Sequence, residues 1–367
     1  MLRSAVRTLR YARGWEHGSG VELQEIETQR DGLLLPTTFA TPASHRGRLP
    51  GWIVLGGVTS MGRFHPQLAK FVNALARSGA AAIVPEVPEW RNLRLEPGVT
   101  VPTVRAAVRA LDARPEVAHG RYGLIGFSFG APQVVIASRH PDLADRLAGV
   151  VSFGGYCDLE RALRCQLTGL HEWRGVTERL EPDPYGLWVP ASNYLTGVPG
   201  REDAGDVAEA LRALALASTT RRLPAWDPLH DELKRELRAA LPAERRALFD
   251  LFVRPAATPV RASEEGEAMA VALAAAGRRH SPLVDPAVEI GRVTHPVHIL
   301  HGRGDRLVPY TESLRLRELL PHAVDRQVTI TGLFAHSAHA RPATIADRVR
   351  EGAILFRGLR RMLALVR

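Results

Sequence analysis

One stretch of sequence decides the fold: Tyr122-Gly123-Leu124-Ile125-Gly126-Phe127-Ser128-Phe129-Gly130. It begins as a short apolar run typical of a buried strand, and residues 131–139 after it have the pattern of a helix. Ser128 therefore lies on a sharp strand-to-helix turn, where a compressed backbone favours glycine two residues to either side. A bare G-x-S-x-G pattern arises by chance in about one in ten chains of this composition, so its specificity comes from the flanking strand and helix.

Strands and helices alternate on both sides of this stretch. We expect strands at residues 21–29, 33–40, 52–55, 80–84, 122–127, 147–153, 297–300 and 327–330. Asp31-Gly32 predicts a hairpin turn between the first two strands. We expect helices at residues 66–77, 101–113, 131–139, 311–320 and from 344 to about 366. Apolar strands alternating with helices predict an α/β fold with a mostly parallel sheet covered on both faces.

The alternation stops between residues 156 and 290, where no run predicts a buried strand. Helical patterns at 202–216, 230–241 and 243–252 are separated by prolines and by aromatic residues, namely Trp173, Tyr185, Trp188, Tyr194 and Trp226. These aromatic side chains could line an apolar pocket or pack the segment against the core. We therefore divide the chain into a basic N-terminal helix or tail (1–20), an α/β core (21–155 and 291–367) and a helical cap insertion (156–290).

The net charge of +9 resembles that of a nucleic-acid-binding protein, but its distribution argues against that class. Arginines supply nearly all of the positive charge, because Lys70 and Lys234 are the only lysines, and they are interleaved with acidic residues along the chain. Cys157 and Cys165 are too few for a disulfide scaffold, and we expect two ordinary thiols. We expect no nucleic-acid partner.

The first fourteen residues carry Arg3, Arg7, Arg10 and Arg13 on one side of a possible helix. We expect this helix to be frayed or to face solvent, with contact to an anionic membrane surface as the alternative. The segment lacks the apolar centre of a signal peptide, and the longest apolar run, residues 268–276, is too short to span a bilayer. These observations predict a cytoplasmic location without a firm membrane anchor.

A serine hydroxyl is a weak nucleophile unless a histidine removes its proton and a carboxylate orients that histidine. Asp305 lies in the loop after the strand at 297–300, and His336 lies in the loop after the last strand. Both loops follow the carboxyl ends of parallel strands, where catalytic groups gather in open α/β sheets. The sequence therefore predicts Ser128, Asp305 and His336 as nucleophile, acid and base, in the chain order Ser, Asp, His.

Alternatives exist for the acid and the base. Asp158 follows the strand at 147–153 and could replace Asp305, and His339 could replace His336. The spacing of His295, His298 and His301 suggests a metal site, but successive odd steps along a strand alternate between its faces, so the three cannot converge. We therefore predict no metal and no cofactor.

An oxyanion hole needs two N–H donors close to the nucleophile. We expect the first from the backbone of Phe129, directly after Ser128. The second should come from the loop Leu55-Gly56-Gly57-Val58-Thr59-Ser60-Met61-Gly62, where glycines let the backbone approach a substrate. Val58 is our choice for this donor, and Thr59 is the next candidate.

On these residues the chain resembles the α/β-hydrolase superfamily, in particular serine esterases and lipases with a helical cap. The resemblance covers residues 21–155 and 291–366 and rests on Gly126-x-Ser128-x-Gly130, Gly56-Gly57, Gly304-Asp305 and His336. It implies an eight-stranded, mostly parallel sheet with an insertion after the sixth strand. One departure is Leu55-Gly56-Gly57, where many relatives have His-Gly. The oxyanion donor is a main-chain amide, so this change is compatible with the mechanism. It leaves open which residue of the loop supplies the second N–H.

The resemblance also implies hydrolysis through an acyl-serine intermediate. We expect a small-molecule acyl substrate, preferably an ester of a hydrophobic acid or alcohol. Thioesterases, peptidases and acyltransferases use the same three residues, and the fold alone does not choose among them. A non-catalytic binding protein is the alternative from a different class, and it predicts a broken triad.

Overall fold

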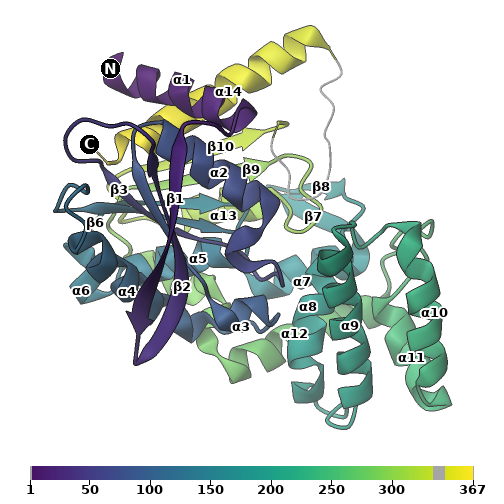
Figure 1. Cartoon of the computed structure of the whole chain (residues 1–367). Helices are drawn as coiled ribbons and strands as arrows, with labels where there is room; N and C mark the ends of the chain where they lie inside the picture. The colour runs from purple at the N-terminus through teal and green to yellow at the C-terminus, as the bar shows by residue number, and fades with distance from the viewer. Residues whose placement is uncertain (1, 334–343, 367) are drawn as a thin grey trace.

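The computed structural model describes residues 2–333 and 344–366, and its centre is an eight-stranded sheet (Figure 1). The strand order is β1-β2-β4-β3-β5-β6-β9-β10, and every neighbouring pair from β4 to β10 is parallel. The strands are β1 (Val21–Arg30), β2 (Leu33–Pro42), β3 (Gly51–Leu55), β4 (Ala81–Pro85), β5 (Tyr122–Phe127), β6 (Leu147–Phe153), β9 (Val297–Gly302) and β10 (Arg326–Thr331). The eight-stranded, mostly parallel sheet is confirmed.

Strands β1 and β2 form the expected antiparallel hairpin. Arg30 pairs with Leu33, so the loop contains only Asp31 and Gly32. Both have positive φ angles, 49° and 84°, as a two-residue turn between twisted strands requires. The dipeptide Asp-Gly supplies these angles at low cost, which explains why this turn could be read from the sequence.

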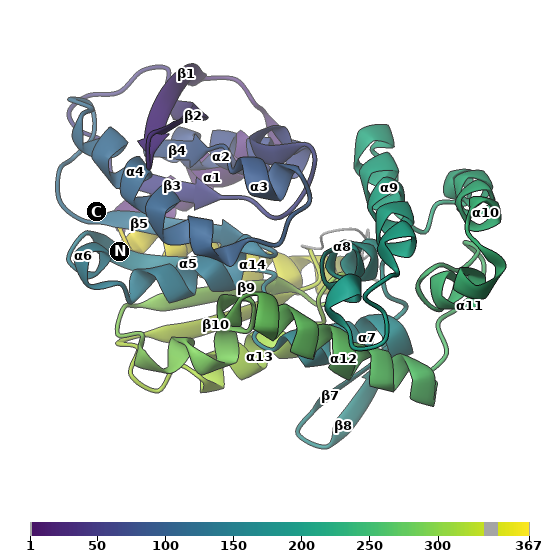
Figure 2. The ribbon, with the colours of Figure 1, turned by 90° about the horizontal axis from the view of Figure 1, so that it is seen from below.

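Helices cover both faces of the sheet, and the strands alternate between two cores. Ile53 and Leu124 belong to one buried cluster, whereas Val54 and Ile125 belong to another on the opposite face. Helices α4, α5 and α13 contribute to the first cluster, and α1, α2 and α14 contribute to the second (Figures 1 and 2). Their bounds are α1 (Leu2–Glu16), α2 (Pro66–Arg77), α4 (Thr100–Asp112), α5 (Gly130–Ser138), α13 (Thr311–Glu318) and α14 (Ile345–Ala364), and the short helices are α3 (Pro88–Arg91) and α6 (Pro141–Ala144).

The expectation of a frayed or solvent-facing N-terminal helix is wrong. Helix α1 packs beside α2 and α14, and Tyr11 is only 4% exposed. The Tyr11 ring meets Phe71 of α2 edge to face at 5.7 Å. Arg7 Nη1 donates to the carbonyl oxygens of Leu363 and Val366, each at 2.8 Å, and so satisfies acceptors at the end of α14. Arg7 thus has a structural role. Within the described residues, no helix is long and apolar enough to cross a membrane.

A largely helical segment lies between β6 and β9 (Figure 2). Its elements are α7 (Leu159–Thr168), β7 (Leu170–Trp173), β8 (Val176–Arg179), α8 (Tyr185–Tyr194), α9 (Gly205–Arg221), α10 (Asp231–Ala240), α11 (Ala243–Phe252) and α12 (Glu264–His280). Trp188, Leu211 and Phe249 from this segment are buried in the same cluster as the sheet residues Ile53 and Leu124. The segment therefore shares one continuous core with the sheet, and the proposed domain division stays a prediction.

The small hairpin β7–β8 is an element that the sequence did not predict. Its strands have four residues each and are half-buried or exposed, so they lack the apolar run that marks a strand. Of the five aromatic residues singled out in the sequence, Trp188 and Tyr194 are buried and pack the helices together.

A buried carboxylate fastens the start of this segment to the core. Glu312 on α13 is 1% exposed and accepts hydrogen bonds from the backbone N–H groups of Cys157 and Asp158, both at 3.0 Å. Arg161 Nε of α7 donates to the same carboxylate at 2.9 Å. Cys157 also donates its thiol to Glu312, and burial raises the pKa of this thiol. Cys157 and Cys165 are both free and buried, as expected.

We predict that Glu312→Gln lowers the free energy of unfolding by about 2–4 kcal/mol. The amide NH₂ of glutamine is a donor, so in this buried site it would face N–H groups that now donate to the carboxylate. Urea denaturation followed by circular dichroism measures this difference. Glu318→Gln on the same helix is the matched control, since Glu318 pairs with Arg174 while both side chains are more than half exposed (53% and 75%). The control should lose no more than about 0.5 kcal/mol. Equal losses in the two variants would contradict the fastening role.

Candidate active site

Ser128 lies on a strained turn between β5 and α5. Its φ angle is +51°, in the left-handed region that residues other than glycine rarely adopt. Its N–H donates to Phe153 O at 2.9 Å, and its carbonyl oxygen accepts from the N–H of Ala131 at 3.0 Å. This conformation costs about 1–2 kcal/mol, so the surrounding structure must hold it. Such strain in a serine at the carboxyl end of a parallel strand is typical of a functional position.

Two glycines permit the compression that the sequence predicted around Ser128. A Cβ atom on Gly126 would lie 2.3 Å from the carbonyl oxygen of Gly130. A Cβ atom on Gly130 would lie 2.3 Å from the carbonyl oxygen of Gly56. Because both obstacles are backbone atoms, which cannot rotate away, only glycine fits at positions 126 and 130 without moving the chain.

The loop after β3 lies directly against Ser128. A Cβ atom on Gly57 would be 2.9 Å from the Cβ of Ser128 and 3.4 Å from its Oγ. Val58 follows in this loop and is 8% exposed. Within the described part of the chain, the N–H groups of Val58 and Phe129 donate to no acceptor. Both amides are therefore available for an oxyanion, although their roles stay predictions.

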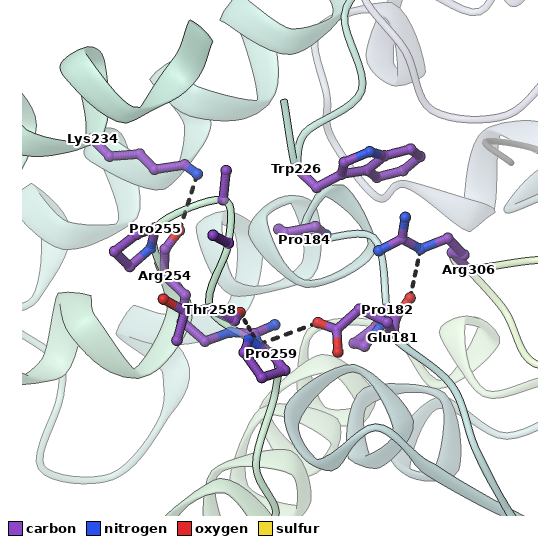
Figure 3. Close-up of a pocket in the computed structure, with 12 residues that line it drawn as sticks. Glu181, Pro182, Pro184, Trp226, Lys234, Arg254, Pro255, Thr258, Pro259 and Arg306 are labelled. Carbon is purple, nitrogen blue, oxygen red and sulfur yellow. Dashed lines mark hydrogen bonds and ion pairs between the residues drawn. The ribbon is translucent and has the colours of Figure 1, made fainter. Parts of the chain in front are cut away.

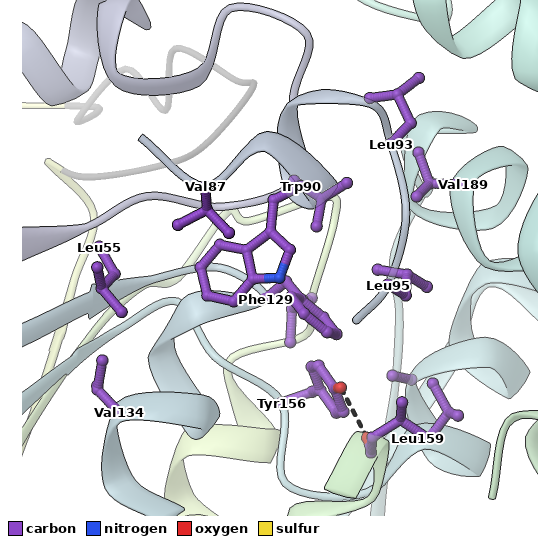
Figure 4. Close-up of a cluster of buried hydrophobic side chains, with 14 of the residues drawn as sticks. Leu55, Val87, Trp90, Leu93, Leu95, Phe129, Val134, Tyr156, Leu159 and Val189 are labelled. Atoms are coloured by element: carbon purple, nitrogen blue, oxygen red, sulfur yellow. Dashed lines mark hydrogen bonds between the residues drawn. The ribbon is translucent and has the colours of Figure 1, made fainter. Parts of the chain in front are cut away.

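An aromatic cluster supports the residue after Ser128 (Figure 4). Phe129 is 7% exposed, and its ring meets Trp90 edge to face at 5.4 Å. Trp90 Nε1 donates to Glu96 O at 2.9 Å, which fixes the indole ring. Tyr156, after β6, lies beside Phe129 in this cluster and donates its hydroxyl to Val284 O at 2.7 Å (Figure 4). The packed ring holds the Phe129 backbone in place.

Asp305 lies in the loop between β9 and α13, as expected, and is 1% exposed. Its Oδ1 accepts hydrogen bonds from the N–H groups of Leu307 and Val308, at 2.9 and 3.2 Å. Its Oδ2 lies 3.4 Å from Nε2 of His301. Two backbone donors stabilise the ionised carboxylate in a fixed orientation, as an acid that orients a histidine requires.

The alternative acid, Asp158, has a structural role. It caps the N-terminus of α7 by accepting from the N–H of Arg161 at 2.8 Å, and it also pairs with the Arg161 guanidinium at 3.2 Å. These contacts are those of an ordinary N-cap residue. They favour Asp305 as the acid.

The histidines singled out in the sequence lie in two places, after the last strand and near β9. His336 and its alternative His339 lie outside the described residues. The histidines near β9 have separate partners: His301 contacts Ser313 Oγ at 2.6 Å and Val308 O at 2.9 Å, and His298 pairs with Asp325 at 3.2 Å. Burial lowers the pKa of His298, so its imidazole favours the neutral form.

Two hydroxyl contacts join the helical segment to the loop beside Ser128, and the sequence did not reveal either pairing. Tyr185 of α8 donates its hydroxyl to Val58 O at 2.9 Å. Ser60 and Thr219 of α9 are joined by a short hydroxyl–hydroxyl bond. Burial and the nearby Asp183 raise the pKa of Tyr185, so its hydroxyl keeps the donated proton. Tyr185 thus fixes the carbonyl group of Val58, the residue whose own N–H is the predicted second donor.

The strain at Ser128 predicts an unusual order of stabilities among substitutions. Ser128→Gly relieves the left-handed conformation that Ser128→Ala retains, so the glycine variant should be at least as stable as the alanine variant, by up to about 1 kcal/mol. Ser218, inside helix α9, provides the control, because there glycine should be about 1 kcal/mol less stable than alanine. Thermal unfolding of the four variants measures both differences. The same order at both positions would contradict strain at Ser128.

Of three comparisons with known proteins, only the one with solved structures finds similar proteins. No family model matches the chain, and a search of curated proteins finds no match. The structure is similar to an acylaminoacyl peptidase of Pyrococcus horikoshii, with a TM-score of 0.51 and 12% identity over 96% of this chain, which spans only 43% of that peptidase.

Two esterase structures align at lower scores. An esterase of Pyrococcus furiosus has a TM-score of 0.46 and 13% identity, with 93% of this chain and 91% of that chain covered. Est1E of Butyrivibrio proteoclasticus has a TM-score of 0.45 and 12% identity, with 93% of this chain and 99% of Est1E covered. At these identities a likeness concerns the fold alone. From the strand order and the peptidase match, the chain has the α/β-hydrolase fold.

Proposed function

We propose that this chain is a serine hydrolase that cleaves a carboxylic ester, or a related acyl bond, through an acyl-serine intermediate. The observation that carries the proposal is the conformation of Ser128. A serine is held at φ +51° by glycine contacts at positions 126 and 130, with the loop of Gly57 against its side chain. A turn that needed only to be tight would favour glycine at its centre, so a strained serine there supports a chemical role.

In the first half of the proposed reaction, Ser128 Oγ attacks the carbonyl carbon while His336 takes the hydroxyl proton. The carbonyl π electrons move to oxygen, and the N–H groups of Phe129 and Val58 stabilise the negative charge. Asp305 orients the imidazole and stabilises its protonated form. As the tetrahedral intermediate collapses, His336 returns the proton to the departing alcohol, which leaves Ser128 acylated.

In the second half, water attacks the acyl carbon and His336 accepts one of its protons. The second intermediate collapses with cleavage of the bond to Ser128 Oγ, and His336 returns the proton to that oxygen. The acid is released and the serine is regenerated. The buried position of Asp305 and its two backbone hydrogen bonds support its part in both halves.

We further propose that the helical segment acts as a cap that selects a hydrophobic acyl substrate. Its contacts with the loop beside Ser128, through Tyr185 and Thr219, support this role. The aromatic pair of Phe129 and Trp90 supplies an apolar wall next to Ser128. Apolar walls with few polar groups are typical of small-molecule sites.

Ser128→Ala should reduce hydrolysis of a p-nitrophenyl ester series by at least about 10⁴-fold and abolish labelling by a fluorophosphonate probe, because the attacking oxygen is lost. Ser138→Ala is the matched control: Ser138 lies on α5, where its hydroxyl donates to Val135 O at 2.8 Å. The control should keep full labelling and turnover. Full turnover by Ser128→Ala would refute the proposal. Within the ester series, faster hydrolysis of longer acyl chains would support the proposed hydrophobic acyl substrate.

Tyr185→Phe should lower kcat at least about tenfold with little change in KM, because loss of the bond to Val58 O loosens Val58, and a displaced Val58 N–H weakens stabilisation of the transition state more than substrate binding. Tyr194→Phe is the control on the same helix, since its buried hydroxyl faces Leu95 O at 3.5 Å and does not contact the loop. Steady-state kinetics of both variants decide the question. An unchanged kcat in Tyr185→Phe, or equal losses in both, would exclude a positioning role.

A further inference from the structure

A cavity lies between the helical segment and the loop after β9, where three distant parts of the chain meet (Figure 3). It encloses about 320 Å³, which is enough for a small molecule. One wall is Glu181, Pro182 and Pro184, between β8 and α8. The opposite wall is formed by Trp226, Lys234 and residues 254–259 of the helical segment, and Arg306 closes it from the loop after β9. Ser128, Val58 and Phe129 are not among its lining residues.

Much of the lining is apolar and stiff. Prolines contribute on both sides, and Trp226 adds an aromatic face; the apolar residues are Pro182, Pro184, Pro255, Ala256, Ala257 and Pro259. Prolines have fixed φ angles and little conformational freedom to lose, so such a wall pre-organises a site.

Three cationic side chains line this apolar cavity. The Arg306 guanidinium stacks on the Trp226 ring at 4.0 Å and donates through Nε to Glu181 O at 2.6 Å, which fixes its plane (Figure 3). Arg254 donates through Nη1 to Thr258 O at 3.2 Å, and Lys234 Nζ donates to Arg254 O at 3.0 Å. Lys234 is only 5% exposed.

Two neighbouring acids form ion pairs with these cations. Asp231 pairs with Lys234 at 2.8 Å, and Glu181 pairs with Arg254 at the longer distance of 3.5 Å. Glu181 also accepts from the N–H of Val260 at 3.1 Å. Among the ion pairs of the described residues, none involves Arg306. Burial lowers the pKa of Arg254, and the nearby Glu181 acts in the opposite direction.

We propose that this cavity binds a small anion that carries a carboxylate or a phosphate on a compact apolar body. The anionic group would lie between Arg254 and Arg306, where guanidinium groups offer paired N–H donors. The apolar body would contact the proline walls and Trp226. This site is separate from the proposed catalytic one, so it does not depend on Ser128 being a nucleophile.

Calorimetric titration of the full chain with benzoate and with phenyl phosphate tests the proposal, with benzamide as the neutral analogue. At least one of the two anions should bind with a saturable one-to-one isotherm that weakens as salt is added, because screening reduces the attraction. The better of the two identifies the anionic group. Benzamide should bind about tenfold more weakly or not at all. Absence of saturable binding by both anions, or equal binding of benzamide, overturns the proposal.

Variants locate the binding to this cavity. Arg254→Gln removes a cation and should raise Kd about tenfold, and Ala257→Trp fills the space without removing any charge and should abolish binding. The matched control is Arg238→Gln, since Arg238 lies on the helix of Lys234 but pairs with Asp250 outside the cavity. Circular dichroism confirms folding of each variant. If Arg254→Gln and Arg238→Gln change the Kd of the anion equally and Ala257→Trp binds it normally, the anion does not bind in this cavity.

The same titration on Ser128→Ala, and on protein inactivated with a fluorophosphonate, separates the two sites. Binding of the anion should be unchanged in both, because Ser128 does not line the cavity. Loss of binding in the inactivated protein would place the anion beside Ser128 and refute a separate site. If the fluorophosphonate fails to react but the anion still binds, the proposed function fails while the second site stands.

Discussion

The close approach of three backbone segments at Gly126, Gly130 and Gly56 is the constraint on which the candidate site depends. The end of β5 and the start of α5 touch at the first two glycines, and the loop after β3 touches α5 at the third. Any side chain at positions 126 or 130 would push these segments apart. The contact forces Ser128 into the left-handed region and brings Gly57 against its side chain. The strain at one residue is thus offset by packing spread over three elements.

Parallel pairing then gathers the remaining groups at one edge of the sheet. Strands β3, β5, β6 and β9 are neighbours, so the loops that follow β3, β5 and β9 lie at their shared carboxyl end. The helical segment is tied to this edge from two sides. Glu312 holds its first residues against the core, and Tyr185 reaches back to the loop beside Ser128. Positions set by the backbone, rather than by long flexible side chains, give such a site its rigidity.

Local signals explain what the sequence could predict. The apolar strand runs, the Asp31-Gly32 turn and the glycines around Ser128 each act within a few residues, and the fold class and strand succession follow from them. Features formed by distant partners could not be predicted. Arg7 bonds to carbonyls more than 350 residues later, Tyr185 pairs with Val58 across 127 positions, and the β7–β8 hairpin is too short and exposed to leave an apolar run. The acceptors in these contacts of Arg7 and Tyr185 are backbone carbonyls, so no side chain in the sequence marks them.

The pairing of β6 with β9 also has a consequence for how the chain folds. Val150 pairs with Val297, so a loop of about 150 residues must close before the sheet is complete. Because synthesis proceeds from the N-terminus, β1 to β6 can assemble while the edge of β6 still has no neighbour. An apolar parallel strand with an unpaired edge invites association with other chains. We therefore expect slow folding, with the joining of β9 as the late step and aggregation as its main competitor.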